Sequence, residues 1–370
     1  MEVNIVDLVK QYQKIQKEID EAILKTIRNG KFILGENVKS LEEELANYCD
    51  VKEAIGVNSG TDALWLSLMA IGVEPGDEVI VPAFTIIVDA SVVCQLKAKP
   101  VFVDIDPVNF NLDPNKLEEK ITKRTKAIIV VHLFGQTAEM GPILEIASRH
   151  GIAVIEDACQ SIGATYKNQK AGAIGDLGCF SFFPTKNLGA YGDGGLITTN
   201  NQSLSEKLRL LRSHGSEKGN KYSHIIIGHN SRLDEIQATV LRVKLKWLDK
   251  WNEARRQNAQ YYNESLQGIG GLITPKEGQN SYHVYHQYTI RSQRRDQLQN
   301  FLQSQGITTN IYYPISLHLQ KALNYLGYRQ GDFPESERAA QEVLSLPVYA
   351  ELEKEKIDYV ISQIKKFLKV

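Results

Sequence analysis

The stretch FSFFPTKNLGAYGDGG, Phe180 to Gly195, places Lys186 directly after an apolar aromatic run and ahead of several glycines. A lysine is usually a solvated surface group, and a glycine-rich segment after an apolar run is usually a turn. Here, however, Cys179–Phe183 has the length and composition of a buried strand, so Lys186 comes just past a strand end. The chain can fold back tightly there because positions 189, 192, 194 and 195 carry glycine. The stretch therefore predicts either an ordinary turn or a lysine held at the edge of a sheet.

The composition is that of an ordinary globular protein, with 370 residues, 42% hydrophobic and 24% charged, and a net charge of −1. Because no run of like charges stands out, we expect neither a nucleic-acid nor a membrane partner. We find no signal peptide and no apolar run of about 20 residues, which favours a cytoplasmic protein. The cysteines form no CxxC pair, so we expect free thiols in a reducing compartment and no metal site: Cys49, Cys94, Cys159 and Cys179.

Short β-branched runs alternate with helical patterns over the first 200 residues. This alternation predicts an α/β fold with a large, mostly parallel, seven-stranded sheet covered by helices on both faces. The last run but one, Cys179–Phe183, follows its predecessor without a clear helix, which leaves antiparallel pairing open. The expected strands are Ala54–Val57, Glu78–Val81, Pro100–Asp104, Ala127–His132, Ala153–Asp157, Cys179–Phe183 and Gly195–Thr199.

The pattern changes after about Ser203, where helical periodicity dominates. One long helix is expected over Asp234–Tyr262, and a smaller α/β unit with a strand at Val284–Ile290 follows it. We therefore expect a large domain over residues 1–268, with N-terminal helices and the long linking helix, and a small C-terminal domain over 269–370. The cleft between two such domains is a usual place for a ligand site.

The first polar strand end is VNSGTDAL, Val57 to Leu64. A strand ends, Ser59-Gly60-Thr61 makes the turn, and the N-terminus of a helix then offers free N–H groups that suit a phosphate. Taken alone, the same residues are equally consistent with a simple helix cap. The segment is neither a P-loop nor a GxGxxG motif, which disfavours nucleoside triphosphates and an NAD-dependent sugar oxidoreductase.

The second polar strand end is VIEDACQSIGA, Val154 to Ala164, where Asp157 closes an apolar strand. A buried carboxylate needs a cationic partner or strong donors, unless this one only caps the next segment. The third strand end carries Ser181 and Lys186. A phosphate cradle, a buried acid and a lysine at neighbouring strand ends suit a ligand with a phosphate, a basic ring nitrogen and an aldehyde. That ligand is pyridoxal 5′-phosphate (PLP).

With these residues in place, the chain resembles the fold-type I PLP enzymes and, within them, the nucleotide-sugar aminotransferases of the DegT/DnrJ/EryC1/StrS group. The resemblance covers nearly all 370 residues. It rests on NSGTDAL, PAFT (Pro82–Thr85), EDACQSIGA, FFPTKNLGAYGDGG, GHNSRLDEIQA (Gly228–Ala238) and YYPISLH (Tyr312–His318).

The resemblance implies a role for each cofactor contact. Lys186 would bind the aldehyde as a Schiff base and shuttle a proton between substrate and cofactor carbons. Asp157 would pair with the pyridine nitrogen, and Gln160 would hydrogen-bond the ring hydroxyl. Phe84 would stack on the ring face, although from the residues alone it is equally a core side chain.

The phosphate contacts implied by the resemblance come from two subunits. Gly60, Thr61 and Ser181 would hold the phosphate, and Asn230 would reach it from a partner subunit. The expected assembly is therefore a homodimer with shared active sites. Sequence alone also allows Asn230 to be an ordinary turn residue.

The expected substrates are an NDP-linked keto sugar and L-glutamate. Family members that dehydrate carry histidine at the position of Lys186, so this chain is expected to transaminate. The KNLGAYGDGG form resembles the subgroup acting on 3-keto sugars, which predicts conversion of dTDP-3-keto-6-deoxyhexose to dTDP-3-amino-3,6-dideoxyhexose. The alternatives are UDP-2-acetamido-3-keto-glucuronate, a 4-keto nucleotide sugar, or a non-catalytic PLP-binding regulator. The expected substrate contacts are Arg232, His286, Tyr313 and His318. The sequence alone also allows the two histidines to be ordinary hydrogen-bonded residues with no role in binding.

Overall fold

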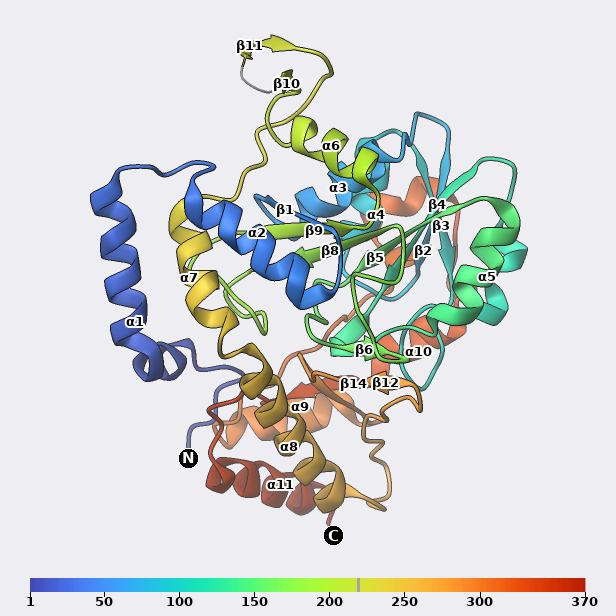
Figure 1. The fold of residues 1–370 in the computed structure, drawn as a ribbon. Helices are drawn as coiled ribbons and strands as arrows, with labels where there is room; N and C mark the ends of the chain where they lie inside the picture. Colours follow the sequence, from blue (N-terminus) through green and yellow to red (C-terminus); the bar gives the residue numbers. More distant parts are fainter. Residues whose placement is uncertain (218–219, 370) are drawn as a thin grey trace.

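A seven-stranded sheet forms the centre of the molecule, whose computed structural model describes residues 1–217 and 220–369 (Figure 1). In spatial order its strands are β1 (Glu53–Val57), β9 (Gly195–Thr199), β8 (Leu177–Ser181), β5 (Ala153–Asp157), β4 (Thr125–Val131), β2 (Glu78–Pro82) and β3 (Lys99–Val103). Strand β9 pairs antiparallel with both of its neighbours, and the other pairs are parallel. The predicted α/β class with a mostly parallel sheet is thus confirmed, and β8 itself runs parallel to β5.

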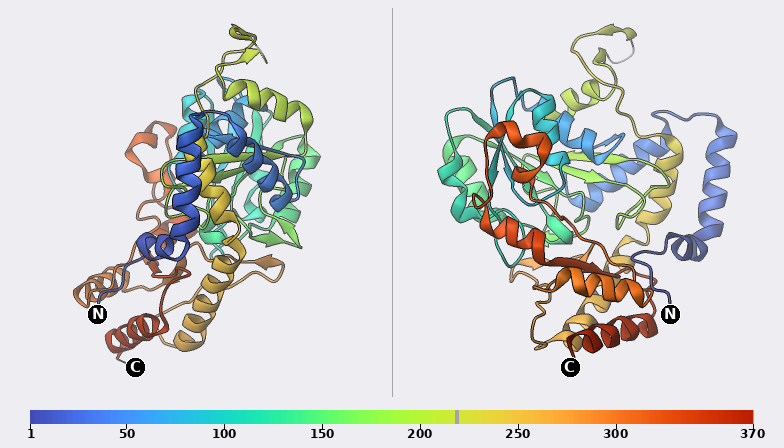
Figure 2. Two further views of the ribbon diagram at one scale, coloured as in Figure 1. Left: turned by 60° about the vertical axis from the view of Figure 1, so that its left-hand side comes forward. Right: turned by 180° about the vertical axis from the view of Figure 1, so that it is seen from behind.

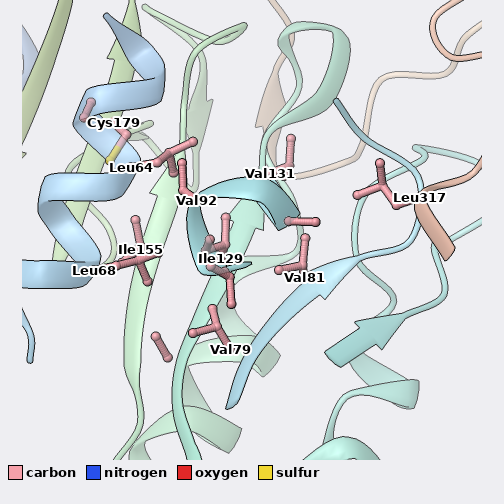
Figure 3. Close-up of a cluster of buried hydrophobic side chains, with 14 of the residues drawn as sticks. Leu64, Leu68, Val79, Val81, Val92, Ile129, Val131, Ile155, Cys179 and Leu317 are labelled. Atoms are coloured by element: carbon pink, nitrogen blue, oxygen red, sulfur yellow. The ribbon is translucent and has the colours of Figure 1, made fainter. Parts of the chain in front are cut away.

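The sheet is buried on both faces because successive side chains of a strand point to opposite sides. Along β4, Ile129 and Val131 belong to one hydrophobic cluster, whereas Ile128 and Val130 belong to another. Figure 3 shows the first cluster, which includes Leu64 of helix α3 (Gly60–Ala70) as well as Ile129 and Val131 of β4. This explains why the strands are nearly continuous apolar runs without alternation in the sequence.

The helices surround this sheet and link it to the C-terminal part of the chain (Figure 1). Their bounds are α1 (Leu8–Asn29), α2 (Glu36–Cys49), α3 (Gly60–Ala70), α4 (Val88–Gln95), α5 (Met140–His150), α6 (Gln202–Leu211), α7 (Glu235–Leu245), α8 (Leu248–Leu266), α9 (Arg295–Ser304), α10 (Pro334–Glu342) and α11 (Lys354–Leu368). Both α1 and α2 contact α7, and the hydroxyls of Thr26 and Thr239 join α1 to α7 at 2.8 Å. Helix α1 is therefore held to the sheet domain largely through α7, whereas α2 also packs directly against the sheet.

The prediction of one long helix over Asp234–Tyr262 is wrong, because this part of the chain forms two helices, α7 and α8. Before the break, Ala238 and Leu241 pack in a cluster against the sheet. After it, Ala259 and Tyr262 pack in a different cluster with the C-terminal elements. Leu248, just after the break, still packs in the first cluster, so the change from one core to the other takes place along α8.

The C-terminal elements gather at one end of the molecule, where both termini also lie (Figure 2). Their core contains side chains from β13 (Tyr288–Arg291), β14 (Val343–Leu346) and helices α8, α9 and α11. The extreme N-terminus joins it, since the N–H of Val3 donates to the carbonyl of Gly306 at 2.9 Å. The domain boundary at residue 268 stays a prediction.

The remaining strands are short and lie outside the main sheet. They are β6 (Thr165–Tyr166), β7 (Gln169–Lys170), β10 (Ser216–Glu217), β11 (Asn220–His224) and β12 (Ser281–Tyr282). The β10–β11 segment projects beyond α6 and away from the body of the molecule (Figure 1). Ile225 and Ile227, which follow it, are 59% and 85% exposed, so this arm presents apolar side chains to its surroundings.

Candidate active site

A cavity of about 380 Å³ lies where β5 and β8 end beside the N-terminus of α3. This position, beyond the carboxyl ends of parallel strands, is where ligands bind in open α/β sheets. Most of the site residues expected from the sequence line this cavity: Gly60, Thr61, Asp157, Gln160, Ser181, Lys186, His286 and Tyr313.

One end of the cavity is built for an anion. Helix α3 begins at Gly60, and the preceding Ser59 caps it by accepting the N–H of Asp62 at 3.1 Å. A Cβ atom at Gly60 would lie 2.8 Å from both Cys159 Sγ and Ser181 Cβ, so only glycine fits this turn. The first-turn N–H groups and the hydroxyls of Thr61 and Ser181 therefore surround a space that suits a phosphate.

The acid of the site is Asp157, which ends β5 and is 4% exposed. Its Oδ1 accepts the N–H of Cys159 at 3.0 Å, so the chain turns back on the carboxylate directly after the strand. A carboxylate so buried is suited to pair with a cationic ligand group, because it has little water around it.

Lys186 follows β8 in a tight loop, in which its N–H donates to the carbonyl of Phe183 at 2.8 Å. Burial lowers the pKa of its amine, and the nearby Cys159, Asp157 and Asp89 partly oppose that effect. A lowered pKa leaves more of the amine uncharged at neutral pH, which is the form that attacks a carbonyl carbon.

Gln160 and Tyr313 form a second hydrogen-bonded wall. The side-chain oxygen of Gln160 accepts the N–H of Phe134 at 2.8 Å, and its amide nitrogen donates to the hydroxyl of Tyr313 at 3.1 Å. Burial raises the pKa of Tyr313, with the nearby Asp89 adding to the effect, so this hydroxyl keeps its proton as a donor.

His286 lines the cavity beside Lys186. Its Nδ1 lies 3.1 Å from the side-chain oxygen of Asn187. Burial, together with the charges of Lys186 and Arg255, lowers the pKa of His286 well below its usual value. The imidazole is therefore neutral at physiological pH.

Four expected site residues do not line the cavity. Phe84 is 1% exposed, and its ring packs 6.2 Å from that of Tyr313. His318 is buried against Glu337, with its Nε2 3.0 Å from the carboxylate. Arg232 donates to the side-chain oxygen of its neighbour Asn230 at 2.9 Å, and both lie on the segment before α7.

The cavity also contains residues that the sequence reasoning missed, among them Ile86, Val88, Cys159, Thr185 and Asp193. Ile86 and Val88 follow the PAFT segment, and Ile86 lines the cavity where Phe84 was expected to. Cys159 lies two residues after Asp157, and Thr185 lies one residue before Lys186. Their closeness in the sequence to these two residues was the signal that could have identified them.

The residues that line the cavity fit the phosphate, the ring nitrogen and the aldehyde of PLP. A glycine turn that admits no Cβ could hold the phosphate, a buried carboxylate could pair with the ring nitrogen, and a lysine amine could hold the aldehyde. Fold and site together define a PLP-dependent aminotransferase. A model of the DegT/DnrJ/EryC1/StrS aminotransferase family matches residues 13–365, and the chain belongs to this family. Its members are PLP-dependent, and the chain is a nucleotide-sugar aminotransferase.

The chain is similar to other proteins along its whole length. A "Pleiotropic regulatory protein" of Geobacillus stearothermophilus is 51% identical over 99% of both chains. A UDP-N-acetyl-3-dehydro-α-D-glucosamine 3-aminotransferase of Acidithiobacillus ferrooxidans is 44% identical over 99% of this chain and 98% of its own. A dTDP-3-amino-3,6-dideoxy-α-D-galactopyranose transaminase of Aneurinibacillus thermoaerophilus is 42% identical over 99% of both. The crystal structure of Streptomyces venezuelae DesV with a ketimine intermediate superposes with a TM-score of 0.97 at 41% identity, covering 100% of this chain and 99% of the other.

No helix within 1–217 and 220–369 is long and apolar enough to cross a membrane. The same residues contain no group of three or more His, Cys, Asp and Glu side chains that could hold a metal ion.

Proposed function

We propose that the protein transfers the amino group of L-glutamate to C-3 of a nucleotide-linked keto sugar. The substrate we favour is dTDP-3-keto-6-deoxyhexose, converted to dTDP-3-amino-3,6-dideoxyhexose. The observation that carries this proposal is the meeting of Lys186 and Asp157 in one cavity, with Lys186 inside the KNLGAYGDGG segment. The relatives named for 3-amino sugars support amination at C-3.

PLP supplies an electron sink and a carrier for the amino group when it is bound. Gly60, Thr61 and Ser181 would bind its phosphate, and Asp157 would hold a proton on its ring nitrogen. The amine of Lys186 would hold the aldehyde of PLP and would serve as the base and acid that moves a proton between the donor's α-carbon and the cofactor carbon. In the second half-reaction, the same amine moves a proton in the opposite direction.

We further propose that Tyr313 and His286 line the part of the cavity that binds the sugar. The hydroxyl of Tyr313 is a donor, and the free nitrogen of neutral His286 is an acceptor, so the pair matches neighbouring groups of a hexose. Ile86 and Val88 form an apolar part of the wall and exclude water from the reacting carbon.

We also propose that the enzyme is a homodimer in which Asn230 and Arg232 complete the partner's site. Both lie on the segment after the projecting arm and outside the cavity of their own chain. Apolar residues at the turn between α1 and α2 are exposed as well, which suits an interface: Phe32 (43%), Ile33 (49%) and Leu34 (39%).

Subunit complementation tests this assembly. Lys186→Ala and Asn230→Ala proteins are each expected to be nearly inactive, whereas a mixed dimer contains one site with both native residues. Recovery of activity on exchanging subunits supports shared sites. No recovery, with exchange verified by mass spectrometry, would show that Asn230 serves its own chain.

The substrate is tested with the aminated form of the enzyme. The protein is loaded with pyridoxamine phosphate and incubated with a panel of dTDP- and UDP-linked 3-keto and 4-keto sugars. We expect the dTDP-3-keto-6-deoxyhexose to be aminated fastest, as measured by the mass of the amino sugar and the return of the PLP absorbance. Faster amination of UDP-2-acetamido-3-keto-glucuronate or a 4-keto sugar would move the assignment to that substrate.

A regulatory role is the second candidate, because the 51% identical relative carries a regulatory name. The lysine and the buried acid of the cavity favour catalysis. A protein that releases 2-oxoglutarate from L-glutamate, and a Lys186→Ala variant that does not, would support the enzyme.

A further inference from the structure

A second buried carboxyl group lies behind Asp157. Asp89, in the first turn of α4, is 0% exposed and close enough to Asp157 for a carboxyl–carboxyl hydrogen bond. Its Oδ2 accepts the hydroxyl of Thr85 at 2.7 Å. Its Oδ1 is also buried, and no donor for it is found among residues 1–217 and 220–369. An acceptor buried beside another carboxylate is costly unless a proton lies between them.

The surroundings of Asp89 favour the protonated form. Burial and the adjacent Asp157 raise its pKa well above the usual value. The hydroxyl of Thr85 and the amine of Lys186 act in the opposite direction, as does the N-terminal turn of α4. Lys186 is a weak counter-charge, because burial lowers the pKa of its own amine.

Two other titratable groups near Asp89 supply no positive charge. They are Tyr313 and Cys179, whose pKa values are raised by burial, with Asp89 contributing to both shifts. A proton on Oδ1, the buried oxygen without a partner among the described residues, would leave Oδ2 to accept the hydroxyl of Thr85.

We propose that Asp89 is a positioning residue, a neutral carboxylic acid whose Oδ1–H donates to the carboxylate of Asp157 and fixes it toward the ring nitrogen of PLP. The hydrogen bonds then converge on Asp157: Thr85 donates to Asp89, Asp89 donates to Asp157, and the ring nitrogen of PLP would donate to Asp157 as well. The backbone N–H of Cys159 holds Asp157 from the other side. The inference rests on the cofactor role proposed for Asp157 and is independent of which sugar is aminated.

The proposal is tested first on the cofactor-free protein by infrared spectroscopy with ¹³C-labelled aspartate. At neutral pH, we expect a carboxylic-acid C=O band that shifts with the label and is missing from Asp89→Asn. A wild-type protein without this band, or a band that survives in Asp89→Asn, would overturn the proposal. Because no cofactor or sugar is present, this result does not depend on the aminotransferase reaction.

The second measurement compares two substitutions by their PLP dissociation constants. Asp89→Asn keeps a donor to Asp157 and is expected within about threefold of wild type. Asp89→Ala loses a hydrogen bond to a charged group and is expected to bind PLP about tenfold more weakly. Equal weakening in both variants would show that the charge of Asp89 acts, and would overturn the neutral-acid assignment.

Two controls keep the comparison interpretable. Circular dichroism of both variants verifies that they fold. If Asp89→Ala does not fold, Thr85→Val takes its place, with about threefold weaker PLP binding expected because Asp89 is no longer oriented. Unchanged PLP binding in Thr85→Val would contradict the hydrogen-bond direction. A wild-type protein that binds PLP but aminates no sugar would refute the proposed function and leave this inference standing.

Discussion

The side chain of Asn187 fixes the tautomer of His286 in the active site. Its amide nitrogen donates to Asn252 Oδ1 at 2.7 Å and to the carbonyl of Val284 at 3.2 Å. Its oxygen, 3.1 Å from Nδ1 of His286, must therefore accept, so Nδ1 carries the hydrogen and Nε2 is a free acceptor. The residue after Lys186 thus ties the catalytic loop to α8 and to the chain before β13.

Replacing Asn187 by alanine is expected to damage both the fold and the site. The substitution leaves the buried Asn252 oxygen and the Val284 carbonyl without their donor. We expect the free energy of unfolding to fall by about 2 kcal/mol or more. Urea unfolding of cofactor-free protein measures the loss, and His286→Ala serves as the matched control with a smaller effect on stability. Equal stability of Asn187→Ala and wild type would contradict the assigned hydrogen bonds.

The pH dependence of catalysis should contain no limb from His286. Its pKa lies well below 6.5, because burial disfavours the charged ring and Lys186 and Arg255 repel a further positive charge. The ring is therefore already neutral throughout pH 6 to 8, and raising the pH removes no proton from it. We expect His286→Gln to lower kcat/KM without changing the shape of its pH profile over that range. A limb that vanishes in His286→Gln would show that the imidazole titrates there.

Strand ends were the part of the site that the sequence predicted well. Asp157, Lys186 and the Gly60 turn were recognised because each polar residue follows an apolar run, and parallel strands bring such ends to one edge. It was harder to predict which side chain within a motif lines the cavity. The wall residue is Ile86, whereas Phe84 was expected, because sequence spacing does not say which side chain of a non-repetitive segment points into a cavity.

Long-range partners could not be predicted either. His318 pairs with Glu337, and Asp89 lies beside Asp157, in each case through a contact that no local pattern encodes. The break between α7 and α8 was also not predicted, since the helical periodicity continues across it. Local rules therefore gave the elements and their order, and tertiary packing decided the contacts between them.

Lys244 is expected to make stability depend on pH in a definite direction. It is 1% exposed, and its amine donates to the carbonyl of Gly189 at 2.7 Å, within the loop that follows Lys186. Burial lowers its pKa to about 8, and Glu351 partly opposes this. The unfolded chain, with a lysine pKa of about 10.4, binds more protons between these values, so unfolding becomes less favourable as the pH rises through that window.

Lys244→Met removes this titration and isolates its effect. The wild-type free energy of unfolding, relative to the variant, should rise by about 2 kcal/mol between pH 8 and pH 10. Below pH 8 the difference should be constant, because the lysine is protonated in both states. Denaturant unfolding at a series of pH values measures it. A difference that does not change with pH would mean that the buried amine titrates near its ordinary value.

Glu156 is expected to be essential for the stability of the loop over residues 172–175. Its carboxylate accepts three backbone N–H groups of that loop at 2.7 to 2.8 Å, and lies 2.8 Å from Nε2 of His132. Nδ1 of His132 accepts the N–H of Ala138, so Nε2 carries the hydrogen and donates to Glu156. In Glu156→Gln, an NH₂ group must face donors, and we expect a loss of about 2 to 4 kcal/mol in thermal or urea unfolding.

His132→Gln is the matched control for Glu156→Gln, because it removes one donor and leaves the carboxylate with its three backbone partners. We expect it to lower the free energy of unfolding by about 1 kcal/mol. If the two variants lose the same stability, the loop contacts of Glu156 contribute nothing beyond the bond to His132.

The glycine at position 60 should be required for binding the phosphate of PLP. A methyl group there would lie 2.8 Å from Cys159 Sγ and from Ser181 Cβ, so the turn must open to accept it. We expect Gly60→Ala to weaken PLP binding by about tenfold, since displaced N–H groups no longer point at the phosphate. Adding Cys159→Ala removes one of the two close contacts and should restore part of the affinity. Gly270→Ala, where no atom lies within 4 Å of the added Cβ, should bind PLP like wild type in the same fluorescence titration. Undiminished affinity in Gly60→Ala would mean that the phosphate binds elsewhere in the cavity.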